Sequence, residues 1–238
     1  IDTELLLKDI ETVEKQVDRF KRQAKSNNKE DLKNLEISQK ILAHLEDEKP
    51  ARAIELDEAG QALLKEMFLL TAKPILYVCN VEEDAVNDGN EHSERFKAAV
   101  AGEPAEVILV SAAIEADIAE LETKEERLEF LNDMGLDEPG VNRVIRATYK
   151  LLNLITYFTA GVKEVRAWTI QDGWKAPQAA GVIHTDFEKG FIRAEVIKYN
   201  DYVNLGSEQA VKEAGKMAVE GKEYVVTDGD VMHFRFNV

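Results

Sequence analysis

Two short polar motifs, each directly after an apolar run, hold the residues best placed to do chemistry. Asn80-Val-Glu-Glu83 follows the run 74–79, and Ser111-Ala-Ala113 follows the run 106–110. If both runs are parallel strands, these motifs lie at the carboxyl ends, where open α/β sheets bind ligands. Two interpretations stay open from the residues alone. The motifs either recognise a ligand, or Asn80 serves the loop and Ser111 caps the next helix.

A phosphate-binding loop would need the pattern Gly-x4-Gly-Lys-Ser/Thr. Gly-Lys occurs at 215–216 and 221–222, but Ala210 and Lys216 stand five residues before these glycines. Met217 and Glu223 follow the two lysines, so the hydroxyl that would hold magnesium is missing too. We therefore expect no ATP hydrolysis by this chain on its own.

The other reactive side chains predict no metal or nucleophilic site. No two of the four histidines have ligand spacing, and one cysteine cannot complete a zinc site. Cys79, on an apolar run, is predicted to be buried and inert, and a lone cysteine fits a reducing cytoplasm. His184 and Asp186 fall in a loop-like stretch, where a hydrogen-bonding role is expected rather than catalysis.

Two helices are predicted at the start of the chain. Over residues 2–24, apolar side chains recur every three or four positions: Leu6, Ile10, Val13, Val17 and Phe20. After a polar break at 25–31, a weaker stripe follows, with a polar gap at Ser38-Gln39: Leu32, Leu35, Ile41, Leu42 and Leu45. Long helices joined by a short polar turn predict an antiparallel helical hairpin, stabilised mainly by burying both stripes.

The middle of the chain alternates strand and helix patterns. Residues 74–79 and 106–110 read as buried strands, and four helices are predicted at 57–70, 91–101, 112–121 and 124–134. This order is typical of a parallel α/β layer. Two strands are few for such a sheet, so further strands are expected from outside this sequence.

The last part of the chain changes to a period of two. After a helix at 140–154, side chains alternate over 165–170 and 192–196, and Asp228-Gly229 marks a turn before a strand at 231–236. A helix around 207–215 has Ser207 as its expected N-cap. These patterns predict a small α+β domain.

The runs 154–170, 181–196 and 228–236 closely resemble the C-terminal TGS domain of the YchF/Obg-like ATPases. The resemblance covers the whole chain but only the later part of the family protein, whose phosphate-binding loop and magnesium ligands lie further upstream. It implies an α+β multi-domain fold. The expected parts are a coiled-coil-like helical hairpin at 1–70, the distal part of the nucleotide-binding domain at 71–139, a connecting helix at 140–152 and a β-grasp TGS domain at 153–238.

The resemblance also gives the two polar motifs a role. Guanine-binding GTPases carry Asn-Lys-x-Asp after a strand, and Asn80-Val-Glu-Glu83 resembles the Asn-x-x-Glu version of this family. The lysine is absent and the acid is one methylene longer, so guanine donors would be left unpaired and ATP is expected over GTP. The implied base-binding residues are Asn80, Val81, Glu83, Ser111, Ala112 and Ala113. Mg²⁺ would be held by the upstream region.

The charge of the chain limits where it can contact RNA. The net charge is −16, and residues 1–152 carry 20 basic against 34 acidic side chains. Such a surface repels nucleic acid, so any contact must be local. The candidates lie at the hairpin tip and on the last domain: Arg19, Lys21, Arg22, Lys25, Lys29, Lys33, Arg166, Lys189 and Arg193. An ordinary solvated surface is the alternative, and core packing is favoured over base stacking for Trp168 and Trp174.

The family resemblance implies a ribosome-associated ATPase that regulates translation or stress responses and contacts rRNA and ribosomal proteins through the hairpin and the TGS domain. We expect the protein to be cytoplasmic and monomeric. No apolar run approaches the roughly 20 residues that a membrane-spanning helix needs, so no membrane contact is expected. The alternative is a non-enzymatic module that binds RNA or protein through the same surfaces.

Overall fold

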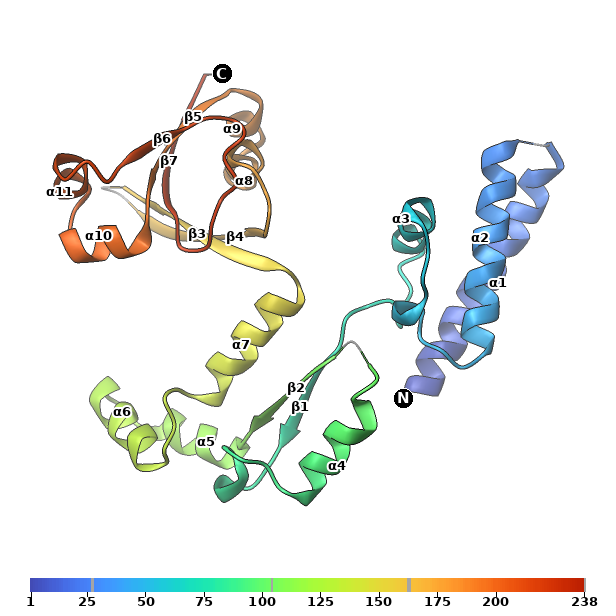
Figure 1. Ribbon diagram of the computed structural model, residues 1–238, viewed down its shortest axis with the longest axis horizontal. Coiled ribbons are helices and arrows are strands. Elements are labelled where there is room, and N and C mark those ends of the chain that lie inside the picture. The colour runs from blue at the N-terminus through green and yellow to red at the C-terminus, as the bar shows by residue number, and fades with distance from the viewer. Residues whose placement is uncertain (27, 104, 162–163, 238) are drawn as a thin grey trace. The chain divides into compact units, whose positions relative to one another are not determined.

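The computed structural model describes residues 1–26, 28–103, 105–161 and 164–237, and it has a mixed helix and sheet architecture (Figure 1). The chain forms two compact units, residues 1–144 and 145–238. In the described residues, no helix is both long and apolar enough to span a bilayer.

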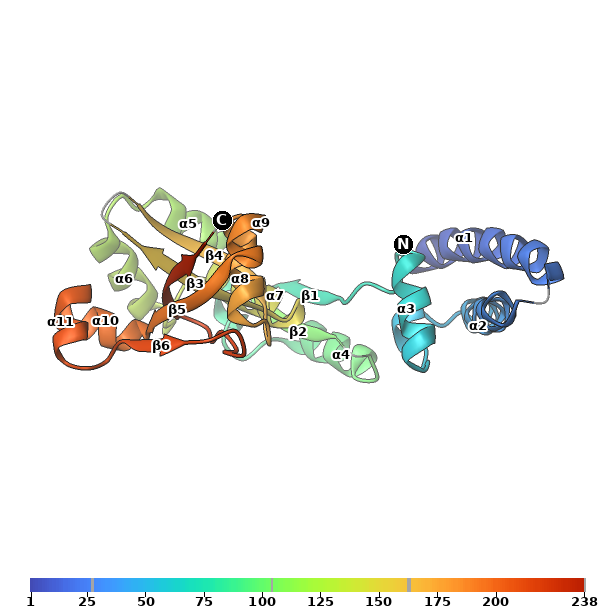
Figure 2. The ribbon, with the colours of Figure 1, turned by 90° about the horizontal axis from the view of Figure 1, so that it is seen from above.

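The first unit begins with two long helices that pack against each other. The chain ascends α1 (Asp2–Gln23), passes a short 3-10 turn (Ala24–Ser26) and returns along α2 (Lys29–Glu46) (Figure 1). Figure 2 shows α2 almost end-on where α1 is seen along its length, so the two axes cross at an angle. The Asn28 side chain caps α2 by accepting from the amide of Glu30 at 3.1 Å.

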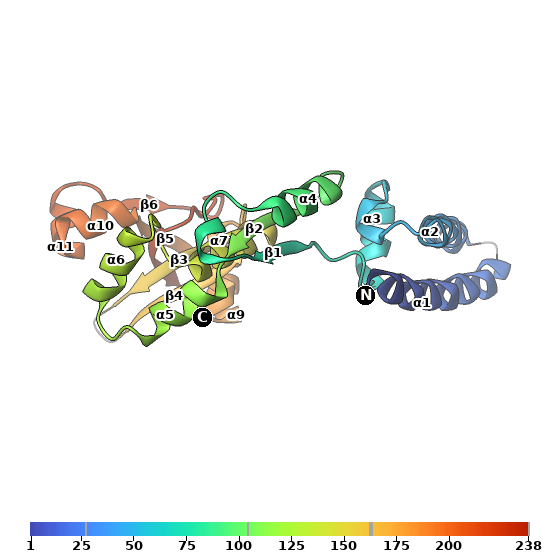
Figure 3. The same ribbon diagram turned by 90° about the horizontal axis from the view of Figure 1, so that it is seen from below.

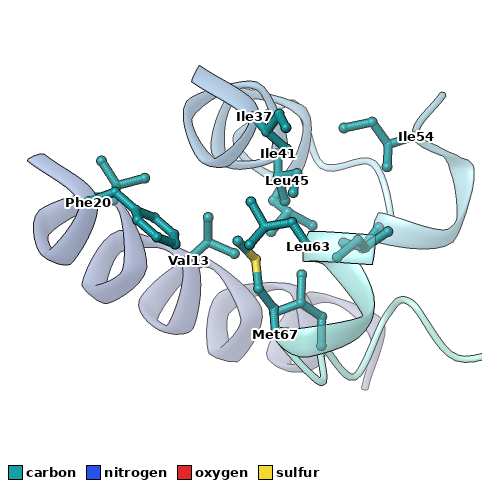
Figure 4. Packing of buried hydrophobic residues seen from close by; sticks show 12 residues of the cluster. Val13, Phe20, Ile37, Ile41, Leu45, Ile54, Leu63 and Met67 are labelled. Carbon is teal, nitrogen blue, oxygen red and sulfur yellow. The ribbon is translucent and has the colours of Figure 1, made fainter. Parts of the chain in front are cut away.

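The core between these helices confirms the predicted stripe on α1 and corrects the one on α2. Val13, Val17 and Phe20 are buried, together with residues of α2 and the following segments (Figure 4). On α2, however, Leu32 is 45% exposed, while Ile37 and Ser38 are buried. The sequence predicted a polar break in this apolar stripe at Ser38, but Ser38 is buried. Its hydroxyl donates to the carbonyl of Asn34 at 2.7 Å, so the side chain can be buried.

A buried carboxylate ties α1 to the segment that leads into the sheet. Asp9 accepts hydrogen bonds from the amides of Leu70 and Thr71 at 2.8 and 2.7 Å, and from the Thr71 hydroxyl at 2.7 Å. The same hydroxyl accepts from the amide of Ala51 at 2.9 Å, in a short 3-10 helix (Ala51–Ala53). Helix α3 (Glu58–Glu66) contributes Leu63 and Leu64 to the core.

The rest of the first unit is a two-stranded parallel sheet with helices. β1 (Leu76–Asn80) pairs with β2 (Glu106–Val110) in register from Leu76↔Glu106 to Asn80↔Val110. A 3-10 turn (Glu83–Ala85) and α4 (Glu91–Val100) connect them, and α5 (Ala112–Glu120) and α6 (Lys124–Asp133) follow. Their core includes Val86, Ile114, Ile118, Leu131 and Leu136.

The prediction of fully buried strands was wrong for β1. Val78 is 48% exposed and Cys79 is half-buried, so the thiol is not sealed in a core. The reason is that, among the described residues, β1 pairs with β2 alone. A parallel strand is ordinarily covered on both faces.

The second unit is built on a five-stranded sheet with the order β4-β3-β7-β5-β6. β3 and β7 are parallel, and the other neighbours are antiparallel. Figure 3 shows β3 and β4 side by side. The strands are β3 (Leu154–Ala160), β4 (Val165–Gln171), β5 (Phe191–Ile197), β6 (Ala218–Glu220) and β7 (Val231–Phe236). The helices are α7 (Gly140–Leu151), which begins in the first unit, α8 (Ala176–Ile183), α9 (Thr185–Lys189), α10 (Tyr199–Leu205) and α11 (Glu208–Glu213).

Two hydrophobic clusters fill this unit. The larger one holds Tyr157, Ala179, Ala194 and Met232, and the smaller one joins Val211 of α11 to the sheet. Ser207 caps α11 as predicted, accepting from the amide of Ala210 at 3.2 Å.

The loop predicted around His184 and Asp186 is wrong. This stretch is helical on both sides of His184, whose Nδ1 accepts from the amide of Asp186 at 3.2 Å and so starts α9. The predicted hydrogen-bonding role of His184 is thereby confirmed.

Candidate functional site

The loops after β1 and β2 enclose a cavity of about 570 Å³ in the first unit. It brings together most of the predicted base-binding residues and adds two acids that were not predicted, Glu82 and Asp84. The lining residues are Asn80, Val81, Glu82, Glu83, Asp84, Ser111 and Ala113. Ala112 is not among the lining residues, but its amide donates a hydrogen bond to the Asn80 side chain. The volume lies within the range of small-molecule sites.

Asn80 joins the two loops directly. Its Oδ1 accepts the amide N–H of Ala112 at 2.9 Å, which fixes the orientation of the carboxamide. The NH₂ group is therefore a donor that stays available for another acceptor. One residue further, the amide of Val81 donates to the carbonyl of Val110 at 2.9 Å, so the strand pairing continues into the loop.

The three acids after Val81 give the cavity its electrostatic character. Glu82, Glu83 and Asp84 are all exposed, and Glu83 opens the short 3-10 turn that bends the chain away from β1. Ionised carboxylates only accept hydrogen bonds. This end of the cavity suits a neutral group that presents N–H donors, and it opposes a phosphate. The Val81 side chain is half-buried and packs against the neighbouring core.

Ser111 differs from the expected helix cap. It stands at the N-cap position of α5, but its side chain makes no capping hydrogen bond. The residue is 1% exposed, and its Oγ has no partner among the described residues. Ser111 therefore lines the cavity without capping α5 through its hydroxyl.

Helix α5 also reaches the start of α7. The Glu115 carboxylate accepts the amide of Gly140 at 2.6 Å and that of Val141 at 3.2 Å. A carboxylate at a helix N-terminus satisfies free amides and the helix dipole. The approach is close, because a Cβ on Gly140 would lie 2.9 Å from Glu115 Oε1.

The lining of the cavity offers no positively charged side chain for a triphosphate. The residues around it are acceptors, an amide and apolar groups, without a lysine or arginine in the lining. No cluster of three or more His, Cys, Asp or Glu that could hold a metal occurs in the described part of the chain.

The predicted RNA-binding residues are exposed but differ in their surroundings. At the helix pair they lie on α1, the turn and α2. Lys21 lies 3.6 Å from Asp18, and Lys33 lies 3.2 Å from Asp57, the N-cap of α3. Arg19, Arg22, Lys25 and Lys29 form no ion pair that we observe among the described residues.

On the second unit, Arg166 and Arg193 each pair loosely with a glutamate, Glu164 and Glu195, at 4.0 Å. Lys189 is exposed at the end of α9. Trp168 and Trp174 are partly buried and pack against the larger cluster, so the favoured core interpretation holds for both. Arg166 lies over the Trp168 ring, 4.0 Å from its centroid.

One polar cluster in the second unit was not predicted from the sequence. Asp230 is fully buried and accepts from Lys198 Nζ at 2.7 Å and Tyr224 OH at 2.6 Å. It also accepts from the amide and hydroxyl of Thr227 at 3.0 and 2.9 Å. Burial, followed by the bond to Asp230, raises the pKa of Tyr224. The cluster is closed on itself and fixes the turn before β7.

The chain matches known proteins over all its length. The family model YchF-GTPase_C, described as "Protein of unknown function (DUF933)", matches residues 154–237. "Ribosome-binding ATPase YchF" of Bacillus subtilis is 53% identical over 240 residues, covering 100% of this chain and 65% of the relative. The protein of that name from Escherichia coli O157:H7 is 52% identical over 238 residues, with the same coverage of 100% and 65%.

A solved structure agrees with these relatives. The "Schizosaccharomyces pombe YchF GTPase" superposes with a TM-score of 0.85 at 36% identity, over 99% of this chain and 64% of that one. The chain thus spans 65% of the length of the two curated relatives. On these similarities, and on the family domain over residues 154–237, the chain belongs to the YchF family.

Proposed function

We propose that this chain is the distal part of a ribosome-associated ATPase and that the cavity after β1 and β2 receives the purine base of its nucleotide. The observation that carries this is the hydrogen bond from Ala112 to Asn80, which brings two distant polar motifs into one wall. The names of the relatives, a ribosome-binding ATPase and a GTPase, support a nucleotide-dependent activity. Mg²⁺ and the phosphates would be held by the part of the longer relatives that this sequence does not contain.

ATP is the preferred nucleotide in this proposal, with GTP as the alternative. The amino group of Asn80 can donate to a ring nitrogen that adenine and guanine share. Discrimination then falls to Glu83, which reaches one methylene further than the aspartate of guanine-binding sites. Guanine donors that this carboxylate does not meet stay unpaired, and each costs about 1–3 kcal/mol.

The test is a change of base selectivity in a protein of the full length of the relatives. Glu83→Asp, alone and with Val81→Lys, should raise GTP affinity relative to ATP by about tenfold or more. Glu83→Asp is also tested alone, because Val81→Lys changes a side chain that packs against the core. Asp84→Glu is the matched control, since it changes the length of a neighbouring acid. Equal selectivity in all four proteins would refute base recognition by Glu83.

We further propose that the α1–α2 helix pair is the helical hairpin of the family and that the second unit is its β-grasp TGS domain, both contacting the ribosome. The exposed basic residues between Arg19 and Lys29, on a chain of net charge −16, support a local phosphate contact. Lys25→Gln with Lys29→Gln should weaken ribosome binding and flatten its salt dependence. Lys33→Gln is the control, because Asp57 already pairs with Lys33.

The whole protein would act in the cytoplasm, as a monomer, as a regulator of translation or stress responses. The second candidate is a binding module without a nucleotide role, which the acids in the lining of the cavity and its lack of lysine and arginine favour. Ribosome binding by the 238-residue chain with no measurable nucleotide affinity, in the chain or in the longer protein, would select the module.

A further inference from the structure

We infer that the outer edge of β4 is a docking site for an extended segment of a partner protein, which joins the sheet of the second unit as a further strand. In the described residues, β4 ends the sheet and pairs with β3 alone. The register of this pair runs without a break over all seven residues of β4, from Leu154↔Gln171 to Ala160↔Val165. A long and regular edge is a template for another strand.

The hydrogen bonds at the end of β4 identify the backbone groups that face away from β3. The amide of Asp172 donates to the carbonyl of Asn153 at 2.9 Å, so this pair is a hydrogen-bonded one. Hydrogen-bonded and non-hydrogen-bonded pairs alternate along an antiparallel ladder. Val165, Ala167 and Thr169 therefore direct their N–H and C=O groups outward, and no protein partner for these groups is observed in the described part of the chain.

The outward positions carry none of the features that ordinarily protect an edge strand. Such edges are shortened, bulged, or interrupted by charge or proline. The three outward residues of β4 are valine, alanine and threonine, and all are exposed, Val165 at 73%. The opposite edge of the sheet is protected by its length, because β6 has only three residues. Of the two edges, β4 is therefore the one that can accept a strand.

The side chains around this edge specify the chemistry of one face of the partner. Successive side chains of a strand point to opposite faces of the sheet. On the face of Ala167, a cavity of about 720 Å³ reaches the edge, and its lining includes Ile145, Tyr149 and Phe158. Ile145 is 49% exposed. Every second side chain of the partner should therefore be apolar.

Arg166 specifies the other face. Its side chain is 57% exposed, and its pair with Glu164 is loose at 4.0 Å. A residue directly opposite on an added strand would lie about 5 Å away between Cβ atoms. A carboxylate at that position would be complementary in charge to the guanidinium. The partner segment should therefore carry an acidic residue between two apolar ones.

The same features favour a protein segment over other occupants. Outward N–H and C=O groups at the spacing of a strand are matched by another polypeptide backbone. A second copy of β4 would present only valine, alanine and threonine on the face of the cavity, and these side chains fill little of about 720 Å³. A segment with larger apolar side chains is the better fit.

The experiment follows amide hydrogen exchange by NMR in the 238-residue chain. The probe is the capped peptide Ser-Ile-Thr-Ile-Glu-Ile-Thr-Ile-Ser, which reads the same in both directions, so either orientation places glutamate opposite Arg166. We expect a dissociation constant below about 1 mM and slower exchange at Val165, Ala167 and Thr169. The amide of Val219 in β6 should not change. The same peptide with N-methylated isoleucines keeps its side chains but lacks the donors that face β4, and it should bind about tenfold more weakly or worse.

Two variants test the backbone and the charge separately. Ala167→Pro removes an outward N–H but no donor to β3, so it should abolish binding while the β3–β4 pairing remains. Arg166→Glu should weaken binding about tenfold, and a peptide with lysine in place of glutamate should restore it. Arg193→Glu is the matched control, because Arg193 of β5 is 53% exposed and also lies 4.0 Å from a glutamate. It should leave binding unchanged.

Several results would overturn the inference. These are no binding of the peptide, equal binding of the peptide and its N-methylated form, or binding without protection of the outward amides. Protection that grows with protein concentration in the absence of peptide would assign the edge to a second copy instead. Protection by a single-stranded RNA tetramer and not by the peptide would assign it to RNA. The Glu83 test of base selectivity can fail without affecting any of these results.

Discussion

The Asp9 carboxylate holds the segment between the helices and β1 through three hydrogen bonds. Asp9→Ala would leave the amides of Leu70 and Thr71 without their acceptor, and Thr71 is only 4% exposed. We expect the free energy of unfolding to fall by about 3 kcal/mol. Urea unfolding followed by circular dichroism measures it. Asp18→Ala is the control, because Asp18 is 70% exposed in its pair with Lys21 and should change stability by less than about 0.5 kcal/mol. Equal losses would mean that Asp9 is not a structural anchor.

Glu195 makes the stability of the second unit depend on pH. Its hydrogen bond to Arg235, opposed by burial, lowers the pKa of this carboxyl below its usual 4.5. The unfolded chain therefore takes up the proton first as pH falls, so the stabilisation is present above pH 4.5 and is lost through the acid range below it. Arg235→Gln should remove about 1 kcal/mol at pH 7. The variant and wild type should converge as the pH falls well below 4.5, as thermal unfolding would show; a constant difference would contradict this.

Single residues also show what sequence reasoning can reach. Asn80 and Ser111 could be picked out because each directly follows an apolar run, and a strand end is where ligands bind. Asp9 and Asp230 could not, since a charged residue is ordinarily exposed. The donors to Asp9 are distant in sequence, at Leu70 and Thr71, and Asp230 combines nearby donors with the distant Lys198. The orientation of the Asn80 amide likewise depends on a partner 32 residues away.

At the scale of elements, α2 offers a direct test of its corrected stripe. Ile37 is 8% exposed and Leu32 is 45% exposed, so only the first is a core residue. Ile37→Ala should lower the free energy of unfolding by about 3 kcal/mol, because it leaves a cavity. Leu32→Ala on the same helix should cost less than about 1 kcal/mol. Urea unfolding of both variants measures this, and the reverse order would restore the stripe predicted from spacing.

Elements with a regular period could be predicted, and short ones could not. The apolar positions of α1 follow from the sequence because they repeat over several turns. On β5 the predicted alternation was wrong at Ile192, which is 55% exposed while Ala194 and Val196 are buried, because the register shifts between Phe191 and Arg193. Helices α8 and α9 are 8 and 5 residues long, and no period is visible over such lengths. Their helical state depends on packing, with Ala176, Ala179 and Ala180 fully buried against the sheet.

At the scale of the whole molecule, the proposal predicts that ATP hydrolysis needs a protein as long as the relatives and not this chain alone. The 238-residue chain should show no ATP turnover above background, because the cavity after β1 and β2 has no lysine or arginine in its lining and the described residues hold no cluster for a metal. A protein as long as the relatives should hydrolyse ATP, and Asn80→Ala should weaken its ATP binding about tenfold or more. Phosphate release and nucleotide titration measure both. Turnover by the shorter chain at an ordinary enzymatic rate would defeat the proposal.

The contact of Glu115 with Gly140 restricts how members of the family can be recombined. A Cβ added at Gly140 would come within 2.9 Å of the Glu115 carboxylate, so the carboxylate would have to move from its place on the helix N-terminus. A crossover point between residues 115 and 140 would draw the acid from one parent and the glycine from another. Chimaeras should therefore inherit both positions together, and a parent that varies one of them is expected to vary the other.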